Sequence, residues 1–104
     1  MKYLSNAFSL NMLKEEGTIS ILRKHITPGE VPSDALSIVG HADIASILTS
    51  MLGREVAMNR VSQRLNDGDE LFVAQYIGPR LPEGATTLPE GARIEFYKLT
   101  LSEV

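Results

Sequence analysis

One segment, residues 42–52, has the periodicity of an amphipathic helix, and it limits the folds open to the rest of the chain. Its apolar residues follow the spacing i, i+3, i+4, i+7 and i+8, at Ile44, Ile47, Leu48, Met51 and Leu52. Gly53 comes directly afterwards and is suited to end a helix, because glycine readily adopts a left-handed conformation. Strand-like segments outnumber this helix, so its apolar stripe is expected to cover a β-sheet.

Five segments have the composition or alternation of β-strands, namely 2–5, 18–26, 59–65, 70–77 and 93–101. The third and fourth flank Asn66-Asp67-Gly68-Asp69, and Asp-Gly accepts the positive φ of a tight turn, so these two segments are predicted to form a hairpin. Ser9 is placed to cap a short helix over residues 10–15 that ends at Gly17. Residues 28–33 have the composition of a loop. We therefore expect one domain over residues 1–104, of the α/β class, with a mixed β-sheet of about five strands, one main helix and a short N-terminal helix.

The composition excludes several classes of protein. Apolar residues make up 43% of the chain and charged residues 22%, as in ordinary globular domains. A net charge of −3 argues against binding of long nucleic acid, but it allows a small phosphate ligand held by a few arginines. The chain has no cysteine, so a disulfide framework is impossible. Since neither a membrane span nor a signal-peptide pattern is apparent, we expect a cytoplasmic protein that does not bind membranes.

Three basic residues stand where predicted elements begin or end. His41 comes just before the helix, where unpaired backbone N–H groups favour anions such as phosphate. A histidine there can act as a general acid, or it can simply cap the helix. Arg60 opens one predicted strand and Arg80 follows another. Both suit phosphate recognition, although surface arginines are commonly only solvated.

Several neutral polar residues are also candidates for ligand binding. Gln75 shares a predicted strand face with apolar residues, so its amide needs a hydrogen-bond partner, either from a neighbouring loop or from a ligand. Asn6, Ser9 and Asn11 follow the first strand and can be ligand-binding residues or turn and capping residues.

No metal-ligand spacing is evident. His25 lies among charged residues and is expected to be solvated or structural, while Asp67 and Asp69 are better explained by a solvated turn than by a cation site. Further on, Leu81-Pro82-Glu83-Gly84-Ala85 recurs as Leu88-Pro89-Glu90-Gly91-Ala92. This echo indicates two similar turns in one loop, or else a mobile flap over a site.

The order of short motifs resembles the small viral anti-CRISPR ring nucleases and their bacterial and phage relatives. These enzymes destroy cyclic tetra-adenylate, the second messenger of type III CRISPR defence. The most specific motif is the string Asn-Ala-Phe-Ser-Leu-Asn-Met-Leu over residues 6–13. The resemblance spans most of the chain, and its other anchors are Gly40-His41, Gly53, Asn59-Arg60-Val61, Gln75 and Arg80-Leu81-x-Glu83-Gly84.

The resemblance implies an α/β homodimer that binds cyclic tetra-adenylate across its two-fold axis. It makes His41 the catalytic histidine, with Glu83 as the glutamate near it. It implies ligand-binding roles for Asn6, Ser9, Asn11, Arg60, Gln75 and Arg80. The implied reaction needs no metal or cofactor, and a ribose 2′-hydroxyl of the ring attacks the adjacent phosphorus. The product is linear di-adenylate ending in a 2′,3′-cyclic phosphate.

Two departures from the family pattern keep a second hypothesis open. Pro82 replaces a glutamate, and residues 81–92 are shorter than the helical segment that helps to cover the ligand in viral members. The segment between residues 26 and 40 is short as well. The shortened loop favours a sponge that binds the cyclic oligonucleotide without cutting it, whereas His41 with the two arginines favours an enzyme. The acidic balance disfavours a third hypothesis, a DNA-associated accessory protein.

Overall fold

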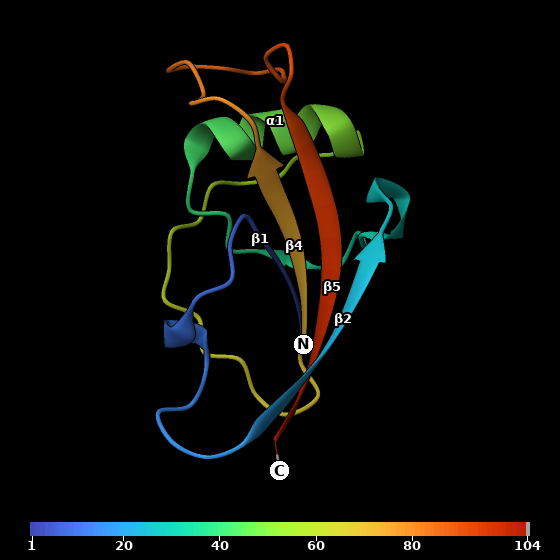
Figure 1. The fold of residues 1–104 in the computed structure, drawn as a ribbon. Coiled ribbons are helices and arrows are strands. Elements are labelled where there is room, and N and C mark those ends of the chain that lie inside the picture. Colours follow the sequence, from blue (N-terminus) through green and yellow to red (C-terminus); the bar gives the residue numbers. More distant parts are fainter. Residues whose placement is uncertain (104) are drawn as a thin grey trace.

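The computed structural model describes residues 1–103, which form a five-stranded mixed sheet with one α-helix (Figure 1). The strand order is β2-β5-β4-β1-β3. Strand β5 pairs antiparallel with β2 and β4, while β1 runs parallel to both β4 and β3. The predicted α/β class and mixed sheet are therefore confirmed. The strands are β1 (Lys2–Ser5), β2 (Ile19–Ile26), β3 (Leu36–Ser37), β4 (Glu70–Ile77) and β5 (Arg93–Glu103).

Helix α1 (Ala42–Leu52) has the predicted bounds. Gly53 is in the left-handed conformation with a φ of 69°, and its N–H donates to the carbonyl of Thr49 at 3.1 Å. In Figure 1 the helix lies behind β4 and β5. Its buried residues Ile44 and Leu48 belong to the same apolar cluster as Phe72 and Phe96 of the sheet. The helix therefore covers one face of the sheet, as its apolar stripe predicts. No helix within residues 1–103 is long and apolar enough to cross a membrane.

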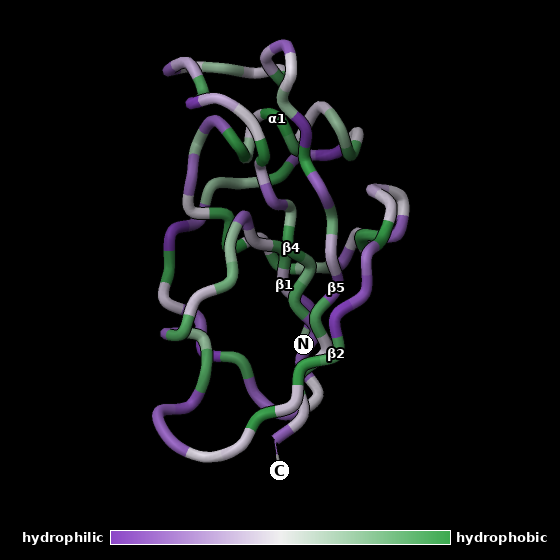
Figure 2. Tube along the Cα trace, in the orientation of Figure 1, coloured by the Kyte–Doolittle hydropathy of each residue, from purple (hydrophilic) through white to green (hydrophobic). Residues whose placement is uncertain are grey.

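The opposite face of the sheet is covered only in part, and by irregular chain. There Leu71, Leu99 and their neighbours form a second cluster, against which Met12 and Leu13 pack and to which buried Leu65 belongs. Strand β2 lies at the edge beyond this cover. Figure 2 shows that it changes along its length from hydrophobic to hydrophilic residues. Part of this second face, near the hydrophilic end of β2, is therefore left open.

The predicted hairpin is wrong. Residues 59–65 form no strand, because both edges of β4 are already paired, one with β5 and the other with β1. The segment instead runs along the second face, where the N–H of Leu65 donates to the carbonyl of Met12 at 2.8 Å. Just before it, Met58 makes an isolated parallel bridge with Val39.

The turn at residues 66–69 does exist, and its two carboxylates serve the fold. Gly68 has a φ of 82°. The Asp69 carboxylate is buried and accepts the N–H of Asn66 at 2.8 Å. Asp67 accepts the N–H of Glu103 at 2.7 Å. These bonds fix the entry into β4 and the end of β5, as expected for turn residues.

Other boundaries also differ from the prediction. The expected helix over residues 10–15 is reduced to a 3₁₀ turn, Leu10–Met12, and the Ser9 side chain makes no capping bond there. The predicted loop 28–33 begins with a second 3₁₀ turn, Pro28–Glu30, which is closed by a capping box between Thr27 and Glu30. Strand β3 has only two residues and was not predicted.

Removing one buried side chain of α1 tests this packing. Leu48 is fully buried (0% exposed), so Leu48→Ala should lower the free energy of unfolding by about 2–5 kcal/mol through lost burial and the cavity that remains. Leu10→Ala deletes the same atoms from a side chain that is 84% exposed, and it should cost less than about 0.5 kcal/mol. Urea denaturation measures both. Equal losses would contradict the packing of α1 on the sheet.

Candidate functional site

The parallel strands bring the first site residues to one edge of the sheet. Because β3, β1 and β4 run in the same direction, their carboxyl ends lie at the same edge. Gly40 and His41 come after β3, Asn6 follows β1, and Arg80 comes after β4. Open α/β sheets commonly bind ligands at this edge.

His41 is the N-cap residue of α1. Its backbone is extended (φ −130°, ψ 119°), and its Nδ1 accepts the N–H of Ile44 at 3.3 Å. The capping role considered from the sequence is therefore real. The same bond orients the ring, because a neutral imidazole that accepts through Nδ1 carries its proton on Nε2. The side chain is exposed, so Nε2–H is left as a donor for a ligand.

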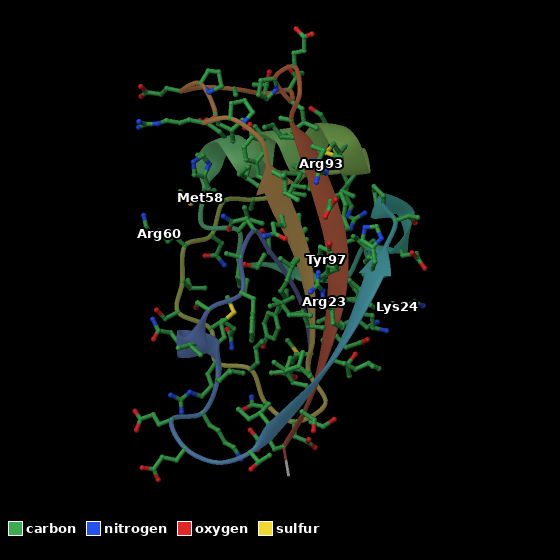
Figure 3. All side chains as sticks on the ribbon, in the orientation of Figure 1. Arg23, Lys24, Met58, Arg60, Arg93 and Tyr97 are labelled. Carbon is green, nitrogen blue, oxygen red and sulfur yellow. The ribbon has the colours of Figure 1, made fainter. Side chains whose placement is uncertain are left out.

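Asn6 and Arg60 both lie against Gly40, the residue that precedes His41. The amide oxygen of Asn6 accepts the N–H of Gly40 at 3.1 Å. The Arg60 side chain lies against Gly40, since its Cγ is 3.4 Å from the position that a Cβ on this glycine would occupy. Figure 3 shows Arg60 at the margin of the molecule, away from Arg23 and Tyr97. Two segments that are far apart in the sequence, one with Asn6 and one with Arg60, thus contact the chain just before α1.

A depression at the start of α1 contains three of the predicted residues, His41, Arg80 and Glu83. Its volume is about 580 Å³, and Asp43, Leu81 and Pro82 complete its wall. The Asp43 carboxylate accepts the N–H of Gly84 at 3.2 Å, which ties the loop carrying Glu83 to the helix. An adjoining hollow of about 340 Å³ shares His41 and Arg80 and also includes Asn6. Two basic side chains, two carboxylates and, in the adjoining hollow, an amide therefore lie around one helix end.

The loop over residues 81–92 consists of two similar turns. The N–H of Ala85 donates to the carbonyl of Pro82, and that of Ala92 donates to the carbonyl of Pro89, both at 3.1 Å. The glycines of the two turns, Gly84 and Gly91, have φ values of 78° and 81°. The repeated sequence therefore forms repeated turns, one of which carries Glu83.

The remaining predicted residues lie outside this depression. Gln75 is exposed on the sheet and lines a separate hollow that also includes Asn6. Asn11 lines a third hollow beside Lys14 and Arg64, and Ser9 is exposed just before the same 3₁₀ turn. No sequence pattern separates these residues from the others, because their positions depend on where the chain crosses the second face of the sheet.

A cluster of charged and aromatic side chains on the open part of the sheet was not predicted from the sequence. The Arg23 guanidinium lies 4.4 Å from the centroid of the Tyr97 ring, and the His25 ring lies 5.0 Å from it. Glu95 accepts hydrogen bonds from Arg93 and from the Tyr97 hydroxyl, which together hold the pKa of its carboxyl below the usual range. The available signal was alternation, since residues two apart in β2 and β5 share one face.

The cation-binding potential of the described chain is small. Within residues 1–103, no group of three His, Cys, Asp or Glu side chains lies close enough to hold a metal ion.

Comparison with known proteins places the chain in a family. Residues 2–98 match the family model described as STIV B116-like. Among solved structures, the chain is similar to B116 of Sulfolobus turreted icosahedral virus, with a TM-score of 0.74 and 28% sequence identity. That similarity covers 93% of this chain and 96% of B116. The curated proteins include no match. Because the family model covers nearly the whole sequence, the chain belongs to the STIV B116-like family.

Proposed function

We propose that this protein is a ring nuclease that binds cyclic tetra-adenylate and cleaves it to linear di-adenylate, thereby switching off type III CRISPR signalling. The observation that carries the proposal is the depression at the start of α1, where His41 lies with Arg80 and Glu83. These three residues match the ring nuclease motifs. Membership of a family named after a viral protein is compatible with an anti-CRISPR role.

The start of α1 supplies a binding site for the reacting phosphate. His41 uses the N–H of Ile44, whereas the N–H groups of Ala42 and Asp43 have no acceptor within residues 1–103. Such groups, together with the helix dipole, favour an anion. Arg80 in the same depression and Arg60 beside Gly40 add positive charge. Charged donors of this kind also stabilise the negative charge of a pentacoordinate phosphate.

The reaction needs one proton donor and one proton acceptor. A ribose 2′-hydroxyl of the ligand attacks the adjacent phosphorus, forming the new P–O2′ bond as the P–O5′ bond breaks. In its imidazolium form His41 donates the Nε2 proton to the departing 5′-oxygen and is left as a neutral imidazole, while the Glu83 carboxylate accepts the proton released by the 2′-hydroxyl. The product ends in a 2′,3′-cyclic phosphate. Because these side chains supply both proton transfers, we propose that the reaction requires no metal.

One observation favours the alternative of a sponge. The Nδ1–Ile44 bond gives His41 a structural task that requires no catalysis. Incubation with cyclic tetra-adenylate in EDTA, followed by chromatography, separates the two functions. The enzyme releases linear di-adenylate under these conditions. A sponge returns the intact ring when it is denatured.

Two substitutions of His41 separate capping from catalysis in the same assay. Both His41→Asn and His41→Ala should slow cleavage by about 10²–10⁴-fold, because each removes the general acid. Asparagine is a good N-cap and should keep the free energy of unfolding near that of the wild type, whereas alanine should lower it by about 0.5–2 kcal/mol. Cleavage by His41→Asn at the wild-type rate would leave His41 with the capping role alone.

The arginines should determine affinity. Arg60→Ala and Arg80→Ala should each weaken binding of cyclic tetra-adenylate by about 1.5–3 kcal/mol, the usual contribution of hydrogen bonds to charged groups. Isothermal titration calorimetry measures this loss. Lys24→Ala is a suitable control, because Lys24 is exposed in β2, far along the chain from both arginines. If both arginine variants bind like the control, the phosphate-binding assignment is wrong.

The proposed ligand also requires a symmetric assembly. A ring of four equal units has a two-fold axis that a homodimer can share, so that each protomer presents its own His41 to one half of the ring. We therefore expect a dimer in sedimentation experiments at micromolar concentration, with or without ligand. A monomer under both conditions would remove the shared site.

A further inference from the structure

The open part of the sheet's second face contains a depression that includes Asn6 and Gln75, which the resemblance assigns to ligand binding, together with Arg23 and Tyr97, to which it assigns no role. Its volume is about 490 Å³, within the range of small-molecule sites. Arg23, Tyr97 and Gln75 line it from three neighbouring strands, β2, β5 and β4. Antiparallel pairing sets His25 opposite Tyr97 and Gln75 opposite Glu95, which places these side chains on one face. Figure 3 shows Arg23 and Tyr97 close together in front of the sheet.

The positive charge of Arg23 has no direct partner in the described chain. No carboxylate within residues 1–103 lies within 4.0 Å of its guanidinium, which instead lies over the Tyr97 ring, 4.4 Å from its centroid. The carboxylate beside Tyr97 is already engaged, since Glu95 binds Arg93 at 2.9 Å and the Tyr97 hydroxyl at 2.8 Å. Arg23 therefore offers an uncompensated, flat cation in a protein whose net charge is −3.

This arrangement has the chemistry of a nucleotide subsite. Nucleobases stack on aromatic rings and on arginine planes, and the guanidinium edge can also donate to a phosphate. A base can stack on the face of the Arg23 guanidinium that points away from the Tyr97 ring. Beside the stack, the amide of Gln75 makes no hydrogen bond within residues 1–103 and can bind a base edge. Phe8, which is 36% exposed, adds an apolar wall.

The subsite lies next to the hollow that contains His41 and Arg80. Asn6 lines the sheet depression, and it also lines the hollow that contains His41 and Arg80. A ligand with several nucleotides can therefore extend from one to the other past Asn6.

We propose that the Arg23–Tyr97 stack, with Gln75, binds a base and phosphate of an oligoadenylate at a position away from the reacting phosphate. The identity of the ligand rests on the proposed function. The preference for a nucleotide rests on the stack itself, because a planar cation above an aromatic ring matches a planar base joined to an anion.

The test uses the His41→Asn protein, which keeps the helix cap and does not consume the ring. In this background Arg23→Gln and Tyr97→Leu should each weaken binding of cyclic tetra-adenylate about tenfold, the size of one base stack or one charged hydrogen bond. Tyr97→Phe retains the ring and should bind within about twofold of the parent. Lys24→Gln is the matched control: it removes a positive charge from the next residue of β2, which lies on the opposite face of the sheet.

The outcomes distinguish this inference from the proposed function. If the parent binds the ring and Arg23→Gln binds it as tightly as Lys24→Gln does, the subsite is wrong and the ring-binding function stands. If the parent does not bind the ring, linear tetra-adenylate is titrated instead. A tenfold loss with Arg23→Gln alone then supports the subsite although the proposed function fails. No binding of the linear chain, or equal losses in both variants, overturns the subsite. Arg23 is exposed, so its variant remains informative even if Tyr97→Leu fails to fold.

Discussion

A single helix can cover only one face of a sheet, and the rest of this structure follows from that limit. Helix α1 has 11 residues and is therefore about 16 Å long, enough to bury the apolar residues of β4 and β5 on one side. The other face must use irregular chain, and Met12, Leu13 and Leu65 cover only part of it. The uncovered part is polar and carries Arg23 and Tyr97. The open depression thus lies where no apolar residues of the irregular segments cover the sheet.

The packing of α1 also determines where its N-terminal end lies. Ile44 and Leu48 belong to the same cluster as Phe72 and Phe96, which fixes the helix against the sheet. The parallel strands then bring Asn6 and Arg80 to the same edge as His41, a position that open α/β sheets commonly use for ligands. The packing that holds α1 on the sheet therefore also positions the residues of the candidate site.

The sequence predicted the elements that depend on a local pattern of residues. It failed where a segment's place depends on which strand it pairs with. Periodicity and Gly53 defined α1, and alternation located β2, β4 and β5. The hairpin prediction failed because the strand-like segment 59–65 competes with β1 and β5 for the edges of β4. For the site, motif matching selected His41, Arg80 and Glu83, which do line one depression. It could not find the pairing of Arg23 with Tyr97, since that contact depends on the register of two strands far apart in the sequence.

The loop over residues 81–92 determines how much of a ligand the proposed reaction site can cover. Its two turns and the hydrogen bond from the N–H of Gly84 to Asp43 hold it at the end of α1, and the resemblance to ring nucleases implies that it covers a ligand less fully than the helical segment of the viral members does. Less cover over a ligand means less buried surface and more exposure of the phosphates to water, which weakens each electrostatic contact. A ligand with several bases can recover part of that binding on the sheet face, through stacking that works without enclosure. The proposed Arg23–Tyr97 subsite would in this way compensate for a smaller cover at the proposed reaction site.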